Sequence, residues 1–407
     1  MNILLVNNQL RLGGAETVVH QLRRGFPSAS LTVAHGQTFP LGVRPLYPRA
    51  LARLSHTRLH RVVERLAPRA AWTDRAFRAL AHAPCDLIHL HNFHGDYATL
   101  ESLAYVARHK PLVWTFHALW GVTGGCDHPR DCRRYLDACG ACPQLGRWPV
   151  PSHDNTAAQL AAKLERLAPL PLHIIAPSHW LADVVRESRV SHHWQVHHIP
   201  NAVDAAFSSA LEKLRRTGDE NPAPTILIVN RNFRDEQKGF PIVQAALSAA
   251  AKALPEPHPR LVLVGENADW ARACLPDWPC DARGYVADTE ALARLHDETD
   301  VFLFASPAEN FPCAVLEAMA AGSCVVATPT GGVVEQIEDG VSGVLASEIS
   351  GVALGAALIR ALTDSELCKR AGEAARARAI SDFNEALFLE RHQQLYAGIV
   401  KDWQPQA

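Results

Sequence analysis

The stretch ILLVNNQLRLGGAETVVHQLRRGF, residues 3–26, joins a short apolar run, a loop with two glycines and a segment with helical spacing. An apolar run of this length that leads into a glycine loop is typical of a buried strand followed by a helix. Residues 3–26 therefore predict the start of a βαβ unit, the repeating element of parallel sheets.

The same succession recurs along the chain. Short apolar runs alternate with helical patterns, which predicts an α/β protein with doubly wound parallel sheets. Ligands of such sheets bind beyond the carboxyl ends of the strands, so the residues just after each run are the first candidates for a site. The further expected strands are 31–35, 87–91, 112–117, 173–178 and 196–201, then 225–230, 260–265, 301–306 and 324–329.

The expected strands fall into two series. A length of 407 residues favours at least two domains. The polar stretch 206–222 separates the two series, and we interpret it as a linker. We therefore expect one Rossmann-like domain at 1–205 and a second at 223–381, followed by a helical tail at 382–407.

Composition narrows the class of protein. The N-terminus has neither a basic leader nor a long apolar run, and no segment reaches the roughly 18 apolar residues of a spanning helix. We expect a cytoplasmic protein whose 10 Cys are mostly free thiols or metal ligands. Residues 1–205 carry 22 Lys and Arg against 14 Asp and Glu, whereas the rest carries 18 against 28, which indicates different roles. Few aromatic residues interleave with the basic ones, so nucleic acid is not an expected partner.

The stretch SPAENFPCAVLEAMAAG, residues 306–322, places two carboxylates around one predicted helix. Glu309 lies in the loop after an expected strand, and Glu317 lies within the helix. The N-terminus of a helix suits a phosphate, because its N–H groups and dipole attract anions. The two carboxylates could accept hydrogen bonds from sugar and ribose hydroxyls. Two solvated glutamates beside an ordinary helix remain the alternative.

Basic residues follow the strand at 225–230. Arg231, Arg234 and Lys238 occur within TILIVNRNFRDEQKGF. Charge-assisted hydrogen bonds are roughly twice as strong as neutral ones, so these side chains could hold a pyrophosphate without a metal. A salt-bridged surface loop is the alternative interpretation.

Together these segments resemble the retaining GT-B glycosyltransferases of family 4, which use nucleotide sugars. The resemblance spans nearly the whole chain, and it is strongest to the colanic-acid-type exopolysaccharide glycosyltransferases. It implies two Rossmann-like domains that face each other across a cleft, with the tail helix crossing back to the first. The segments that carry it are GGAE (13–16), APSHWL (176–181), IPNAVD (199–204), Arg231 with Lys238, GYV (284–286), the two glutamates and GGVVE (331–335).

The resemblance also implies roles for single residues. Arg231 and Lys238 would hold the diphosphate, Glu317 would hold the ribose, and Gly13 and Gly14 would let their loop approach the diphosphate. The residues that the resemblance implies for catalysis are Glu309, His117, Arg231 and Lys238. Glu309 with the backbone of Asn310, Phe311, Pro312 and Cys313 would hold the donor sugar, and Tyr285, Val286 and Leu292 would hold the base.

Three positions depart from the pattern of the family. Asn230 replaces a glycine that often precedes the arginine, the glutamate loop reads ENFP, and Val334 stands where proline is common. These departures leave the identity of the donor open.

Histidines cluster at strand ends in the first domain. His117 lies at the end of the expected strand 112–117, and the resemblance places such a histidine against the donor sugar. We interpret His91, Asn92 and His94 as acceptor-side candidates, with structural histidines as the alternative.

Two further segments, the Cys-rich insertion at 120–146 and the basic segment at 44–82, are candidates for a metal site and a membrane contact. Four Cys with five, six and two residues between them predict a structural zinc site, with disulfides or unliganded thiols as alternatives. They are Cys126, Cys132, Cys139 and Cys142. The segment 44–82 holds nine Arg, so it could bind an anionic membrane, or it could be a packed helix with a solvated basic face.

We therefore expect a retaining glycosyltransferase that moves a sugar from a UDP- or GDP-sugar to a glycan or lipid-linked acceptor in surface polysaccharide assembly. The resemblance implies a front-face mechanism in which the leaving phosphate can take the acceptor proton, so that no dedicated protein base is required. We expect that the catalytic step needs no cofactor. Location at the inner face of the cell membrane would suit a lipid-linked acceptor. Two alternatives stay open: a sugar-nucleotide 2-epimerase of the same fold, and a non-catalytic protein that binds glycans or membranes.

Overall fold

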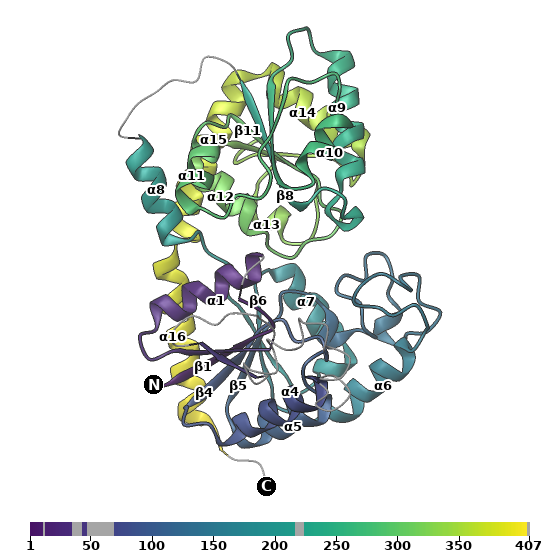
Figure 1. Ribbon diagram of the computed structural model, residues 1–407, viewed down its shortest axis with the longest axis vertical. Coiled ribbons are helices and arrows are strands. Elements are labelled where there is room, and N and C mark those ends of the chain that lie inside the picture. The colour runs from purple at the N-terminus through teal and green to yellow at the C-terminus, as the bar shows by residue number, and fades with distance from the viewer. Residues whose placement is uncertain (11–12, 35–42, 47–68, 216–223, 405–407) are drawn as a thin grey trace, which may run out of the picture. The chain divides into compact units, whose positions relative to one another are not determined.

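The computed structural model describes residues 1–10, 13–34, 43–46, 69–215 and 224–404, without the side chains at positions 69, 215 and 236. The chain forms two compact units (Figure 1). The first unit contains Met1–Ile199 together with Leu389–Ala407, and the second contains Pro200–Phe388.

The first unit is built on a parallel sheet in which the strand order is β3-β2-β1-β4-β5-β6-β7. The chain reverses its direction of winding between β1 and β4, the kind of point at which open α/β sheets bind ligands. The strands are β1 Ile3–Asn7, β2 Ser30–Val33, β3 Val43–Pro45, β4 Leu87–Leu90, β5 Leu112–Thr115, β6 His173–Ala176 and β7 Gln195–His198.

Helices cover this sheet because each places an apolar face on it. Thr99 and Ser178 cap two of them by accepting the N–H groups of Ser102 and Leu181. The helices are α1 Gly14–Gly25, α4 Arg69–Arg78, α5 Leu100–His109, α6 Thr156–Arg166, α7 His179–Glu187 and the greater part of α16 Glu385–Asp402.

The second unit has a parallel sheet with the order β10-β9-β8-β11-β12-β13. Its strands are β8 Thr225–Asn232, β9 Arg260–Glu266, β10 Cys280–Ala282, β11 Val301–Phe304, β12 Cys324–Ala327 and β13 Val344–Leu345. Its helices are α8 Ala205–Arg215, α9 Phe240–Ala253, α10 Ala268–Ala273, α11 Thr289–Asp297, α12 Cys313–Ala321, α13 Val333–Gln336, α14 Gly351–Thr363 and α15 Ser365–Asp382.

Two glycines let the strand ends of the second unit approach one another. Gly239 has a φ of 73°, and a Cβ at this position would collide with the carbonyl oxygen of Ala305. Gly265 has a φ of 143°, and a Cβ there would collide with the carbonyl oxygen of Asn230. Only glycine fits both the backbone angle and the space. The loops after β8, β9 and β11 therefore meet at one edge of the sheet.

The predicted parallel α/β class is confirmed, since every expected strand has a counterpart. The prediction missed β3, β10 and β13. These strands have three, three and two residues, and each lies at an outer position of its sheet, where a short pairing leaves little apolar signal.

The expected linker at 206–222 is wrong over its first half, because α8 occupies Ala205–Arg215. Phe207, Ala210 and Leu211 of α8 are buried in a core cluster of the second unit. Their spacing is that of a helix face, but Ser208 and Ser209 lie between them and Glu212 and Lys213 follow, which made the segment look polar. Residues 216–222 lie outside the described part of the chain.

No helix among the described residues is both long enough and apolar enough to cross a membrane. The expected basic helix within 44–82 falls mostly on residues 47–68, which lie outside the described residues. The described part of that segment includes α4, in which Phe77 is buried and Trp72 is exposed.

Candidate functional site

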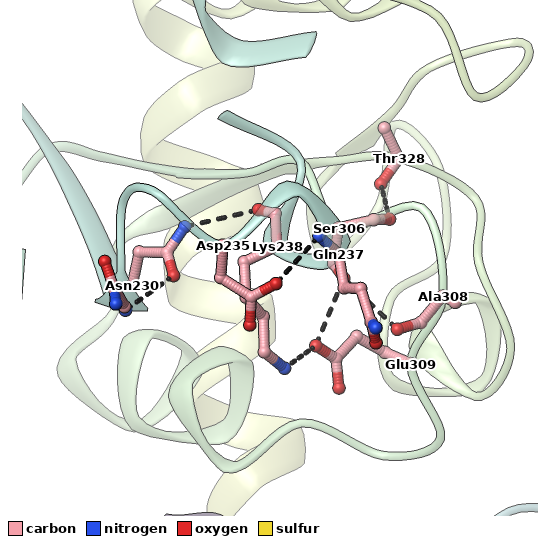
Figure 2. A network of polar contacts seen from close by, with 9 residues as sticks. Asn230, Asp235, Gln237, Lys238, Ser306, Ala308, Glu309 and Thr328 are labelled. Carbon is pink, nitrogen blue, oxygen red and sulfur yellow. Dashed lines mark hydrogen bonds and ion pairs between the residues drawn. The ribbon is translucent and has the colours of Figure 1, made fainter. Parts of the chain in front are cut away.

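The loop that follows β8 is closed by its own side chains (Figure 2). Asn230 donates from Nδ2 to the carbonyl oxygen of Lys238 over 3.2 Å and accepts the N–H of Asn232 at 3.2 Å. Asp235 accepts the N–H of Gln237 at 2.9 Å. A glycine in place of Asn230 could make neither side-chain contact. Asn230, which stands where the family often has glycine, therefore holds the loop that carries Lys238 in place.

Lys238 and Glu309 form an ion pair, with 2.8 Å between Nζ and Oε1. The hydroxyl of Ser306 lies 3.1 Å from the same carboxylate oxygen, and the Thr328 hydroxyl donates to the Ser306 carbonyl over 2.8 Å (Figure 2). The charge of Glu309 raises the pKa of Lys238 although partial burial opposes it. The residues come from the ends of β8, β11 and β12, so the parallel sheet brings together side chains that are 71 positions apart in sequence.

The backbone before α12 is fixed by hydrogen bonds to its carbonyl groups. The Asn310 carbonyl accepts the N–H of Gly332 at 2.7 Å. Asn201 donates to the Phe311 carbonyl over 2.8 Å, and Gln336 donates to the Pro312 carbonyl over 3.1 Å. The helix α12 runs from Cys313 to Ala321, and its capping residue Gly322 has a left-handed φ of 85°. Its first turn therefore presents N–H groups at the edge where Lys238 and Glu309 lie.

Glu317 lies on α12 in a different environment from Glu309. It is half-buried, and burial followed by the charge of Asp204 raises its pKa to about 8. Among the described residues, the basic group within ion-pair distance is His296 of α11, whose Nε2 atom lies 3.8 Å from Oε2 of Glu317. Burial lowers the pKa of His296 to about 3, so the imidazole is neutral.

The other expected donor-site residues of the second unit lie at its surface or its margin. Arg231 is exposed within β8, at the irregularity between Val229 and Asn232 where the pairing with β9 shifts register. Tyr285 is 54% exposed, whereas Val286 and Leu292 pack against a core cluster. Arg234 lies over the ring of Trp270 at 5.3 Å and so belongs to a surface contact. An exposed tyrosine beside the left-handed Gly284 is compatible with base stacking.

In the first unit His91 and His117 contact each other, with 3.0 Å between Nδ1 of His91 and Nε2 of His117. Burial lowers the pKa of His117 to about 3, and burial together with nearby histidines lowers the pKa of His91 well below its usual value. His89 lies behind them, with its ring nitrogens at 2.7 Å from the Thr115 hydroxyl and 2.6 Å from the hydroxyl of Tyr396 on α16. The strand-end histidines are thus neutral hydrogen-bonding groups.

The other first-unit candidates are held by acidic partners. Asn92 donates to Oε1 of the buried Glu16 over 3.1 Å, which joins its loop to the start of α1. Gly13 is the N-cap of α1, and a Cβ there would lie 3.1 Å from Glu16. Nε2 of His94 lies 3.2 Å from Asp127; burial lowers the pKa of His94, but the contact with Asp127 outweighs it and the pKa rises.

The Cys-rich insertion contains no disulfide among the described residues. No three of its four Sγ atoms lie within 4.8 Å of one another, so the zinc site stays a prediction. Lys163 of α6 is fully buried beside this segment and donates to the carbonyl groups of Trp120 and Thr123. Burial lowers its pKa to about 7, while Cys126, Cys139 and Asp127 act in the opposite direction.

Several residues around the site escaped the sequence analysis. Asn201 belongs to IPNAVD and Gln336 follows GGVVE, so the motifs contained or bordered them, but neither spacing shows that they fix the loop before α12. His296 lies in a helix with ordinary amphipathic spacing, and Tyr396 lies in the tail. No sequence signal connects either residue with its partner.

Two family models match the chain. The model described as Glycosyltransferase Family 4 matches residues 12–207, and the model described as Glycosyl transferases group 1 matches residues 212–378. A glycosyl transferase of Escherichia coli named for colanic acid biosynthesis is 25% identical over 354 residues, which cover 81% of this chain and 83% of the relative. The N-acetyl-alpha-D-glucosaminyl L-malate synthase of Bacillus anthracis is 27% identical over 236 residues, or 56% of this chain and 60% of the relative.

Solved structures resemble the whole chain. Sucrose-phosphate synthase from Thermosynechococcus elongatus superposes with a TM-score of 0.69 at 19% identity, and the match covers 99% of this chain and 100% of that one. HepE from Anabaena, solved in complex with UDP-glucose, gives a TM-score of 0.67 at 20% identity and covers 98% of this chain and 100% of that one. These likenesses confirm the predicted GT-B fold.

Proposed function

Because the chain belongs to the glycosyltransferases, with a family 4 segment followed by a group 1 segment, we propose that it is a retaining enzyme that uses a nucleotide sugar. The donor is a UDP- or GDP-sugar, and the acceptor is a glycan or a lipid-linked glycan of a surface polysaccharide. The observation that carries this proposal is the ion pair of Lys238 with Glu309 at the N-terminus of α12.

The second unit offers groups of both signs where a sugar diphosphate needs them. Lys238, with Arg231 seven positions earlier, supplies positive charge for the diphosphate. The N–H groups of the first turn of α12 add partial positive charge. Glu309 is already oriented by Lys238 and Ser306, so it can accept hydrogen bonds from donor hydroxyls without first being ordered. Preorganised groups of this kind contribute most to catalysis when they face the charge that develops on the leaving group.

The transfer step balances within the substrates. The bond between the anomeric carbon and the diphosphate oxygen breaks, and the electron pair stays on the phosphate. The acceptor oxygen then bonds to the anomeric carbon on the same face, and its proton passes to the leaving phosphate. Lys238 and Arg231 stabilise the phosphate charge in this step. In the first unit, we assign the neutral His117 to the donor sugar and His91, Asn92 and His94 to the acceptor.

The relatives support the choice of donor and pathway. The Escherichia coli relative is named for colanic acid biosynthesis, an exopolysaccharide, and HepE was solved with UDP-glucose. UDP is therefore the first nucleotide to test. Calorimetric titration of the purified protein with UDP and with GDP should give micromolar binding of one of them. Absence of binding by both would overturn the proposal.

A structural zinc ion in the Cys-rich insertion is part of the proposal. The backbone of Cys139, Gly140 and Ala141 is left-handed at three consecutive residues, and the N–H of Gln144 points at Sγ of Cys142 over 3.4 Å. Thiolates would also give the buried Lys163 a compensating charge. Zinc would have to draw the four thiols together. Elemental analysis of protein purified without chelators should give one zinc per chain, and a chain free of zinc would refute this part.

The basic segment 44–82 is proposed to bind an anionic membrane that carries the acceptor. Each Arg near such a surface contributes about 1 kcal/mol. Sedimentation with vesicles should therefore show binding to phosphatidylglycerol at low salt and none to phosphatidylcholine. Equal binding to both vesicles, or to neither, would contradict this role.

A further inference from the structure

His296 is a fully buried imidazole that has no hydrogen-bond partner at either ring nitrogen within the part of the chain that the structure describes. It lies on α11, and its ring contacts Phe207 of α8 and Phe302 of β11, each with ring centroids 5.5 Å apart. An imidazole in an apolar cage costs free energy, because both of its polar atoms lose water without gaining a partner. A buried polar group of this kind therefore calls for an explanation.

The imidazole is directed at one polar group, the carboxyl of Glu317. The distance from Nε2 to Oε2 is 3.8 Å, about 1 Å longer than a hydrogen bond to a carboxylate. The other ionisable groups that act on this carboxyl and its neighbourhood are Asp204, which precedes α8, Cys313, one turn earlier on α12, and Glu309, in the loop before α12. None of them is a cation. Of these groups, the Cys313 thiol is only a weak donor, so the neutral N–H of His296 is the stronger donor beside an ionised Glu317.

We propose that His296 is a positioning residue for Glu317 and donates from Nε2 to Oε2 when a nucleotide is bound. The inference rests on the proposed function, in which Glu317 accepts the ribose hydroxyls. An ionised Glu317 uses one oxygen for His296 and turns the other toward the ribose. The hydrogen bond compensates the carboxylate for burial and restricts its rotation. His296 itself touches no substrate in this arrangement.

The test is a cycle of two changes, one in the protein and one in the ribose. The dissociation constant of the nucleotide that the wild type binds, UDP or GDP, is measured by calorimetry beside that of its 2′-deoxy analogue. His296→Phe keeps the ring and removes both nitrogens. We expect this variant to bind the ribonucleotide about tenfold more weakly, the value of one hydrogen bond to a charged group. Its dissociation constant for the deoxynucleotide should lie within about twofold of the wild-type value. The reason is that the deoxynucleotide lacks one of the hydroxyls that Glu317 contacts, so less of that contact is left to lose.

His258→Phe is the matched control, because His258 is a half-buried histidine whose ring contacts that of Trp278 in a tilted arrangement in the same unit. It should bind both nucleotides as the wild type does. His296→Gln restores an N–H and should recover part of the affinity, and this variant also serves if His296→Phe does not fold. If His296 had only a structural role, His296→Phe would weaken the binding of both nucleotides by the same factor.

Each outcome decides a separate point. Equal losses for the ribonucleotide and its deoxy analogue, or no loss for either, would overturn the role of His296 while the proposed function stands. Binding of neither UDP nor GDP by the wild type would overturn the proposed function, and the role of His296 with it.

Discussion

Glu309 and Glu317 are the same side chain in two different electrostatic settings, although only seven residues separate them. Glu309 has Lys238 at 2.8 Å and the Ser306 hydroxyl at 3.1 Å, so its charge is matched before any ligand arrives. Within the described part of the chain, the basic group beside Glu317 is the neutral His296 at 3.8 Å, and burial raises the pKa of Glu317 to about 8. The first carboxylate is preorganised, whereas the second needs a ligand or a rise in pH to ionise.

The largest effect is expected from Lys238→Ala, which removes the cation from Glu309 and from the diphosphate. Loss of one preorganised electrostatic group typically lowers kcat by about 10²–10³-fold. Initial rates of sugar transfer from the nucleotide sugar would measure the loss. Lys252→Ala, at an exposed position of α9, is the control and should retain full activity. Turnover like the wild type in Lys238→Ala would remove the basis for assigning this ion pair to the site.

The second-largest effect is expected on the pH dependence of nucleotide binding, because it depends on the charge of Glu317. A protonated carboxyl cannot accept hydrogen bonds from both ribose hydroxyls as a carboxylate does, and its pKa is about 8 in the absence of ligand. Affinity for UDP or GDP should therefore rise with pH from 6 to 9, by at most about tenfold per unit below the pKa. Calorimetry across this range would measure the rise, and the 2′-deoxy nucleotide corrects for titration of the phosphate.

Glu317→Gln should bind the ribonucleotide weakly, and its affinity should follow pH in parallel with that of the deoxy nucleotide. A wild type whose affinities for the two nucleotides also run parallel across this range would show that Glu317 does not ionise on binding.

A smaller effect is expected on stability without ligand. Folding raises the pKa of Glu317 from 4.5 to about 8, so the folded state keeps a proton that the unfolded state releases between these pH values. The contribution of this group to the free energy of unfolding is therefore present below about pH 4.5 and is lost as the pH rises to about 8. The urea concentration at the midpoint of unfolding would be measured at pH 5.5 and at pH 8.5. The difference between the two midpoints should be smaller in Glu317→Gln than in the wild type. Glu373→Gln, at an exposed position of α15, should leave the difference unchanged.

The smallest effect is expected from Ser306→Ala, which removes one neutral donor from Glu309 and leaves Lys238 in place. One such hydrogen bond contributes about 1 kcal/mol, which corresponds to a loss of roughly fivefold in kcat/KM. Steady-state kinetics would measure it. A loss as large as that of Lys238→Ala would mean that the hydroxyl, and not the cation, orients Glu309.

The parallel α/β architecture could be predicted because its signal is local. Strands such as Ile3–Asn7 and Val301–Phe304 are short apolar runs, and the loops and helices after them carry glycine, proline and capping residues at fixed positions. The rule that ligands bind beyond strand ends then selected Lys238 and Glu309, which the fold places in contact. The α8 helix and the short outer strands were missed because their apolar patterns are brief or interrupted by polar residues.

What the sequence alone determined is the kind of fold, the family and the set of side chains at the strand ends, because periodicity and motif spacing are properties of neighbouring residues. What only the tertiary structure decided is the state of those side chains. Asn230 closes a loop, Glu309 receives a cation from 71 positions away, and Glu317 receives a neutral histidine from another helix. Burial and the distance between charges control ionisation, and both arise only when distant segments of the chain pack together.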